Sequence, residues 1–114
     1  MTADRPQVAE VLTEEPTLCL AGGTASTRVT ATVTESETVS LVVLEILAPG
    51  ADSSTRSVME PTTGDQRAGG DREFFGILGP FATAGPVAFA VELTGRGGHT
   101  DRSLDQTIMV LAQC

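Results

Sequence analysis

The sequence predicts an all-β protein, folded as an antiparallel β-sandwich of about seven short strands. Threonine and valine recur along the chain and favour extended structure, because β-branched side chains lose less freedom on a pleated surface than in a helix. Glycine and proline interrupt the chain roughly every ten residues, as the turns between short strands do. No stretch keeps helical periodicity over about three turns.

The first half of the chain contains three expected strands. The first lies around Thr17 to Leu20. The second, Arg28 to Glu35, has small apolar residues at every second position between threonines, so one of its sides is expected to be buried. After a polar turn over residues 35–37, the third strand, Thr38 to Ala48, is long and apolar and ends at Pro49-Gly50.

The second half contains four further expected strands. A short edge strand comes first and is closed by Pro61, and a loop rich in Gly, Asp and Arg follows over Thr62 to Asp71. The glycines of Gly95 to Gly98 are suited to a hairpin turn, because glycine adopts positive φ at no steric cost. The four strands are Thr55 to Glu60, Glu73 to Leu78, Val87 to Thr94 and Gln106 to Cys114.

The length of 114 residues is that of one domain. Residues 1 to 15 are polar and acidic, and we expect them to form a flexible segment ahead of a sandwich domain over residues 16 to 114. This segment has no positively charged stretch followed by an apolar run, as a signal peptide has. No apolar run approaches the roughly 20 residues that cross a bilayer, so direct membrane insertion is not expected.

The charge pattern argues against nucleic acid as a partner. The net charge is -8, and no lysine is present. A protein that binds phosphates needs a basic patch, whereas the seven basic residues here are dispersed along the chain. They are Arg5, Arg28, Arg56, Arg67, Arg72, Arg96 and Arg102.

The two cysteines, Cys19 and Cys114, enclose nearly the whole chain. Without a C-x-x-C motif they match neither a zinc ribbon nor a thioredoxin-type site, and they are best explained as a disulfide across one domain. Disulfides persist in oxidising compartments, so the domain is expected to be extracytoplasmic, as one module of a longer exported or membrane-anchored chain. The alternative is a cytosolic protein with two buried thiols.

Catalytic, metal and cofactor sites are not expected. His99 is the only histidine, and no Gly-x-Ser-x-Gly elbow accompanies it, so we expect a solvated loop residue. Five aspartates in expected loops could offer oxygen ligands to calcium, but none shows the dense spacing of a calcium loop. These aspartates are Asp52, Asp65, Asp71, Asp101 and Asp105.

Strand alternation predicts an apolar outer face on one sheet. From Val87 to Leu93 every second residue is large and apolar and is expected to face the core, which turns the residues between them outward. The same argument applies to the strand over 38–48 and to the last strand. Such a face, with two acids at its end, is a candidate interaction surface, unless residues 1 to 15 or a neighbouring domain cover it. The outward residues are Leu41, Val43, Glu45, Leu47, Ala88, Ala90, Glu92, Met109 and Leu111.

The second half also resembles immunoglobulin-like and fibronectin type III-like modules. The resemblance rests on Gly79-Pro80-Phe81, Gly85 to Leu93, Gly95 to Gly98, Ser103 and the last strand. The pattern is similar to extracellular modules of bacterial, especially actinobacterial, surface or membrane-anchored proteins, in which an early and a final cysteine clamp the domain. It implies an immunoglobulin-like sandwich. The core Trp and penultimate-strand Tyr usual in these modules are absent, and Phe89 stands in the aromatic place.

Together these observations predict a non-enzymatic, extracytoplasmic module that acts as a spacer, sensor or protein-interaction domain. Its partner is expected to be a protein or a neighbouring domain, and weak self-association is compatible with the apolar face. The alternative is a small self-contained accessory protein that contacts a partner or ligand through the loops at Ala51 to Asp71 and Gly95 to Arg102.

Overall fold

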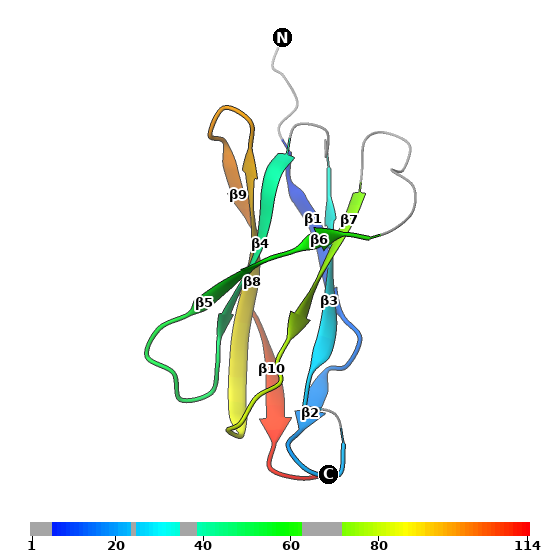
Figure 1. The fold of residues 1–114 in the computed structure, drawn as a ribbon, viewed down its shortest axis with the longest axis vertical. Helices are drawn as coiled ribbons and strands as arrows, with labels where there is room; N and C mark the ends of the chain where they lie inside the picture. Colours follow the sequence, from blue (N-terminus) through cyan, green and yellow to red (C-terminus); the bar gives the residue numbers. More distant parts are fainter. Residues whose placement is uncertain (1–5, 24, 35–38, 63–71) are drawn as a thin grey trace.

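A computed structural model describes residues 6–23, 25–34, 39–62 and 72–114. Within these residues every regular element is a β-strand, and the strands form two sheets packed face to face (Figure 1). The predicted all-β sandwich is therefore confirmed. The expected turn over 35–37 and most of the expected loop over 62–71 lie outside the described residues.

Sheet A has four strands in the order β1-β3-β7-β6, and every neighbouring pair is antiparallel. Its central strand β3 has apolar residues at alternate positions, and these residues are buried as the alternation predicts. The four strands are β1 (Val8–Thr13), β3 (Thr27–Val33), β7 (Arg72–Leu78) and β6 (Glu60–Pro61).

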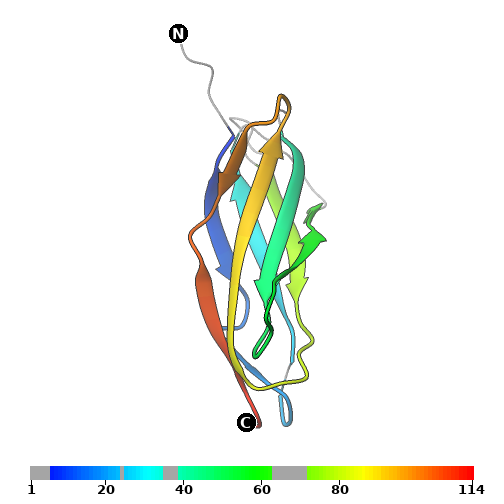
Figure 2. The same ribbon diagram turned by 90° about the vertical axis from the view of Figure 1, so that its left-hand side faces the viewer.

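Sheet B lies in front of sheet A in Figure 2 and has the order β2-β10-β8-β4-β5. A further short strand, β9, pairs with the end of β8 beyond the part that pairs with β10. The β2–β10 pair is parallel, while the other pairs are antiparallel. The strands are β2 (Thr17–Cys19), β4 (Val39–Leu47), β5 (Thr55–Val58), β8 (Gly85–Gly95), β9 (Thr100–Arg102) and β10 (Gln106–Leu111).

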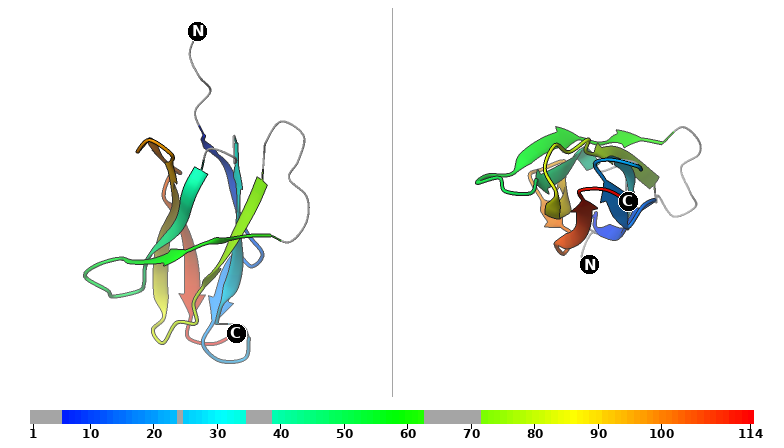
Figure 3. Two further views of the ribbon diagram at one scale, coloured as in Figure 1. Left: turned by 45° about the horizontal axis from the view of Figure 1, so that its top comes forward. Right: turned by 90° about the horizontal axis from the view of Figure 1, so that it is seen from below.

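The hydrophobic core lies between the two sheets, which are seen as two layers from below in Figure 3. Sheet B contributes the inward residues of β8 and β4, with Val91, Leu93 and Leu44 fully buried. Sheet A contributes Val29 and Val33 from β3. Each inward set occupies alternate positions of its strand, so the predicted inward and outward phases of these strands are correct.

The order of the strands is that of an immunoglobulin-type sandwich, whose two sheets contain strands A, B, E, D and G, F, C. Ten strands are present among the described residues, against about seven expected. The three additional elements are the N-terminal strand β1, the two-residue strand β6, and β9, which continues the hairpin from β8.

The N-terminal boundary differs from the prediction. Residues 1 to 15 were expected to be flexible, yet β1 lies within them and pairs with β3. Val8 and Val11 pack partly against the core, and Asp101 of β9 accepts a hydrogen bond from the Val8 amide at 2.9 Å. The sandwich therefore begins well before residue 16, since these contacts tie β1 to both sheets.

The expected strand over Thr55 to Glu60 is divided between the two sheets. β5 pairs with β4 in sheet B, whereas β6 pairs with β7 in sheet A. Between them Met59 is 2% exposed, and its amide donates to the carbonyl of Val42 at 2.8 Å. A Cβ on Gly76 of β7 would lie 3.3 Å from the Cγ of Met59. Because Gly76 has no side chain, the chain has room to pass from sheet B to sheet A at Met59.

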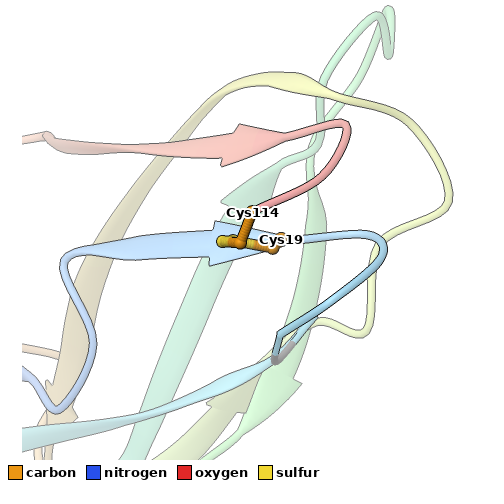
Figure 4. Close-up of a disulfide and its surroundings, with 2 residues drawn as sticks. All are labelled: Cys19 and Cys114. Carbon is orange, nitrogen blue, oxygen red and sulfur yellow. A yellow bond between two sulfur atoms is a disulfide. The ribbon is translucent and has the colours of Figure 1, made fainter.

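A disulfide joins Cys19, at the end of β2, to Cys114, beyond the end of β10 (Figure 4). The two strands are neighbours, and the Cα atoms are 5.8 Å apart, within the range that disulfides span. Near the bond, the amide of Cys114 donates to the carbonyl of Ala21 at 3.0 Å. A Cβ on Gly23 would lie 3.3 Å from the Cys19 sulfur, so the connection after β2 approaches the bond closely.

The core predicts a large difference between two leucine truncations. Leu44→Ala removes a fully buried side chain between the sheets and should lower the free energy of unfolding by about 2 to 5 kcal/mol. Leu104→Ala, at a side chain 88% exposed, should change it by about 0.5 kcal/mol or less. Urea titration of both variants checks this, and equal losses would contradict the packing described here.

The disulfide predicts a second stability effect. Replacing both cysteines with serine should lower the free energy of unfolding by up to about 4.7 kcal/mol, because the bond closes a loop with a sequence separation of 95. Protein prepared without reductant and alkylated in denaturant should gain no alkyl groups by intact mass. Two alkylated thiols, with a urea midpoint that reductant leaves unchanged, would instead indicate free thiols.

Candidate functional site

The nine residues of the predicted interaction face all come from the outward positions of sheet B. In the register of β4 and β8, Leu47 lies opposite Ala88, Glu45 opposite Ala90, and Val43 opposite Glu92. On the far side of β8, Met109 of β10 lies opposite Pro86. The structure thus brings together the outward residues of three strands that are distant in sequence.

The apolar part of this face is less continuous than predicted. Leu41, Leu47, Met109 and Leu111 are 39 to 43% exposed, as an interaction face requires. Val43 and Ala90 face the same way and yet are 6% and 1% exposed, so the expectation that they are open to solvent is wrong. The register places Glu92 opposite Val43 and Glu45 opposite Ala90. Arginines from β5 and β9 reach these two glutamates, so long charged side chains surround both buried positions.

Those charged side chains form an ion-pair network in the middle of the face. Arg56 of β5 donates to Glu45, at 3.2 Å, and to Glu92. Arg102 of β9 donates to Glu45 at 2.6 Å and to Asp105 at 3.3 Å. Glu45 therefore accepts hydrogen bonds from both guanidinium groups. The two glutamates were expected at the end of the face, but they lie in its middle, between Leu41 and Leu47.

Sequence reasoning missed the two arginines of this network. The pairing Glu45↔Arg56 and the pairing Glu92↔Arg102 put opposite charges at facing outward positions of neighbouring strands. One sign of the network was visible in the sequence: Arg56 and Val58 alternate along the expected edge strand, so their side chains point to the same face. It could be used only once β5 was paired with β4 and β9 with β8.

The network perturbs the ionisation of its members. The hydrogen bond from Arg102 holds the pKa of Glu45 below its ordinary value of 4.5, and the positive charge of Arg56 adds to the effect. In return, Glu92 raises the pKa of Arg56, and Glu45 raises that of Arg102. These shifts keep Glu45, Arg56 and Arg102 charged at neutral pH.

A shallow groove of about 440 Å³ adjoins the network on the same face. Leu47, Ala88 and Ala90 line it, and all three are outward positions of β4 and β8. The loop between β4 and β5 adds Asp52, Ser53 and Ser54, and the junction of β9 and β10 adds Arg102 and Asp105. The hollow forms because the outward side chains of β8 are alanines here, while longer side chains stand around them.

The alternative function, binding through the loops at Ala51 to Asp71 and Gly95 to Arg102, involves opposite ends of sheet B. Figure 1 places the β8–β9 turn at the top and the β4–β5 loop at the lower left. Pro49 of the β4–β5 loop approaches Gly85 at the start of β8, whereas His99 accepts a hydrogen bond from Gly95 at its end. Residues 63 to 71 lie outside the described residues, and β5 and β6 occupy much of the remainder. These loops therefore form two separate surfaces.

The remaining polar candidates are dispersed. His99 lies in the β8–β9 turn, and Asp101 is engaged with the amide of Val8. Asp65 and Asp71 are outside the described residues. In the described ranges, no three His, Cys, Asp or Glu side chains lie close enough together to hold a metal ion.

No protein-family model matches the chain, and no curated protein matches it. Across the described part of the chain, no helix has the length and hydrophobicity that spanning a membrane requires.

The lowered pKa of Glu45 predicts an acid-dependent contribution to stability. Because the folded pKa lies below the unfolded one, the ion pairs contribute fully above about pH 4.5 and are lost as the pH falls through the folded value. The difference in urea midpoint between wild type and Glu45→Gln should be constant near neutral pH and should shrink below pH 4.5. Glu14→Gln, at an exposed site outside the network, is the control. A Glu45→Gln difference that does not vary with pH would contradict this account.

Proposed function

We propose that this chain is a non-enzymatic, extracytoplasmic β-sandwich domain that binds a protein partner or a neighbouring domain through the outer face of sheet B. The observation that carries the proposal is the set of large apolar side chains left exposed on this face. Leu47 on β4 and Met109 and Leu111 on β10 flank β8 from its two sides at one end of the face, and Leu41 lies beyond the charged network. Apolar side chains grouped around a polar centre are typical of protein interfaces.

The electrostatics of the two glutamates supports a non-catalytic role. A carboxylate pair that acts as acid and base needs one member with a raised pKa, so that it holds a proton near neutral pH. The pKa of Glu45 is instead lowered by Arg102, and Glu92 is engaged by Arg56. Both acids are therefore better suited to fixing the arginines on the face than to proton transfer.

The disulfide supports the extracytoplasmic location. A bond between β2 and the chain end persists in an oxidising compartment and is rare in a reducing one. The proposal includes the predicted type of module, an immunoglobulin-like or fibronectin type III-like domain of a bacterial surface or membrane-anchored protein. The strand order supports this assignment at the level of fold.

A spacer role is the second candidate, and a separate observation favours it. β1 begins near one end of the long axis of the molecule, and Cys114 lies at the other end (Figure 1). A domain whose chain enters and leaves at opposite poles can hold its neighbours apart. The two roles are compatible, because the outer face of sheet B lies along the side of the molecule (Figure 2).

The binding role predicts unequal effects of two double variants. Peptides selected from a random library displayed on phage, with wild-type protein as the target, should bind Leu41→Ser/Met109→Ser about tenfold more weakly, because both exposed side chains belong to the proposed face. The control is Leu12→Ser/Ile77→Ser, which removes equally large exposed side chains from sheet A. Its affinity should stay within about twofold of wild type.

Titration calorimetry with the selected peptides, and sedimentation for self-association, give the readouts. If the sheet B variant binds and sediments like wild type, the proposed interaction face is wrong. If only the control weakens, the interaction surface lies on sheet A.

A further inference from the structure

We infer that the partner of the outer face of sheet B presents an arginine side chain, which enters the groove between the β4–β5 loop and the β9–β10 junction. This inference rests on the proposed binding function and specifies the chemistry of the partner. It starts from the groove of about 440 Å³, whose apolar lining includes Leu47 and Ala88. A groove open to solvent buries one side of a ligand, so most of the binding surface must come from the exposed apolar residues around it.

The charges that line the groove select a cation. Three carboxylates, Glu45, Asp52 and Asp105, line it together with one guanidinium, that of Arg102. Arg102 already donates to Glu45 and Asp105, so its charge is neutralised within the face. Asp52 forms no ion pair within the described part of the chain, and the side chain of Asp105 is 71% exposed. A cation in the groove would meet free carboxylate oxygens from both walls.

The shape of the groove favours arginine among cations. Its floor at Ala88 leaves room for an aliphatic stem, and Leu47 offers an apolar side wall. The planar guanidinium donates five N–H groups in fixed directions, which suits carboxylates that approach from two sides. The two serines of the loop, Ser53 and Ser54, add neutral acceptors at the rim.

The same charges disfavour a second copy of this chain as the occupant. Each copy carries a net charge of -8, and its groove has three carboxylates against one arginine. Two such faces in contact would bring like charges together with no new cation to neutralise them. A partner that presents a basic side chain from an apolar surface complements both the groove and the leucines beside it.

Two probes test this inference directly. Butylguanidinium, titrated into isotope-labelled protein, should shift the backbone NMR signals of Ser53, Ala88 and Asp105 in a saturable and salt-sensitive manner. Butylurea, which has a similar shape without the charge, should leave them in place. In Asp52→Asn/Asp105→Asn the affinity for butylguanidinium should fall about tenfold.

The matched control is Glu14→Gln/Glu15→Gln, which removes the same amount of charge at exposed sites outside the groove and should bind like wild type. Equal shifts with butylurea, shifts confined to other surfaces, or equal weakening in both double variants would overturn the inference. The selected peptides separate the two proposals. If Leu41→Ser/Met109→Ser weakens the binding of a peptide and Asp52→Asn/Asp105→Asn does not, the proposed binding face stands and the inferred arginine is overturned.

Discussion

The pairing of β4 with β8 determines both surfaces of sheet B. The two strands share eight partnered positions, and their inward residues, including Leu44 and Val91, are fully buried against sheet A. Because strand side chains alternate, a register that buries these residues also fixes which residues stand side by side on the outer face. A slip of one residue would place the core residues in solvent and Glu45 between the sheets. Such a slip would cost much free energy, because it exposes apolar residues and buries a charge. The register, and with it the arrangement of the outer face, is therefore fixed.

Within this fixed register the charged network divides an otherwise apolar surface. Arg56 faces Glu45 and Arg102 faces Glu92 on the adjacent strands. Val43 and Ala90, which lie opposite the two glutamates, are buried. A continuous row of apolar side chains on an outer sheet face favours aggregation, and charges at its centre reduce this tendency while leaving apolar contacts at both ends. The exposed ion pairs contribute little individually to stability, so their main effect is on what the face can bind.

Apart from the disulfide, the features predicted from the sequence depend on neighbouring residues, and those that were missed depend on distant ones. The inward phases of β3, β4, β8 and β10 were correct because alternation is local. β1 escaped notice because its register shifts between Val8 and Glu10, so Val8 and Val11, which pack on the core, are three positions apart. The crossing at Met59 and the ion pairs of Arg56 could not be predicted, since each requires knowing which strand pairs with which.

The disulfide near one pole also has a mechanical consequence. A tension applied to Cys114 would pass through the covalent bond to Cys19 and on to the strands before it, bypassing the 94 residues enclosed between the two cysteines, one fewer than their separation of 95. The strands that form the outer face of sheet B are β4, β5, β8, β9 and β10, and all of them lie inside that loop. Under load, the segment ahead of Cys19 can be drawn out, whereas the contour length stored between the cysteines cannot be released. The surface that carries the groove is therefore outside the load-bearing path.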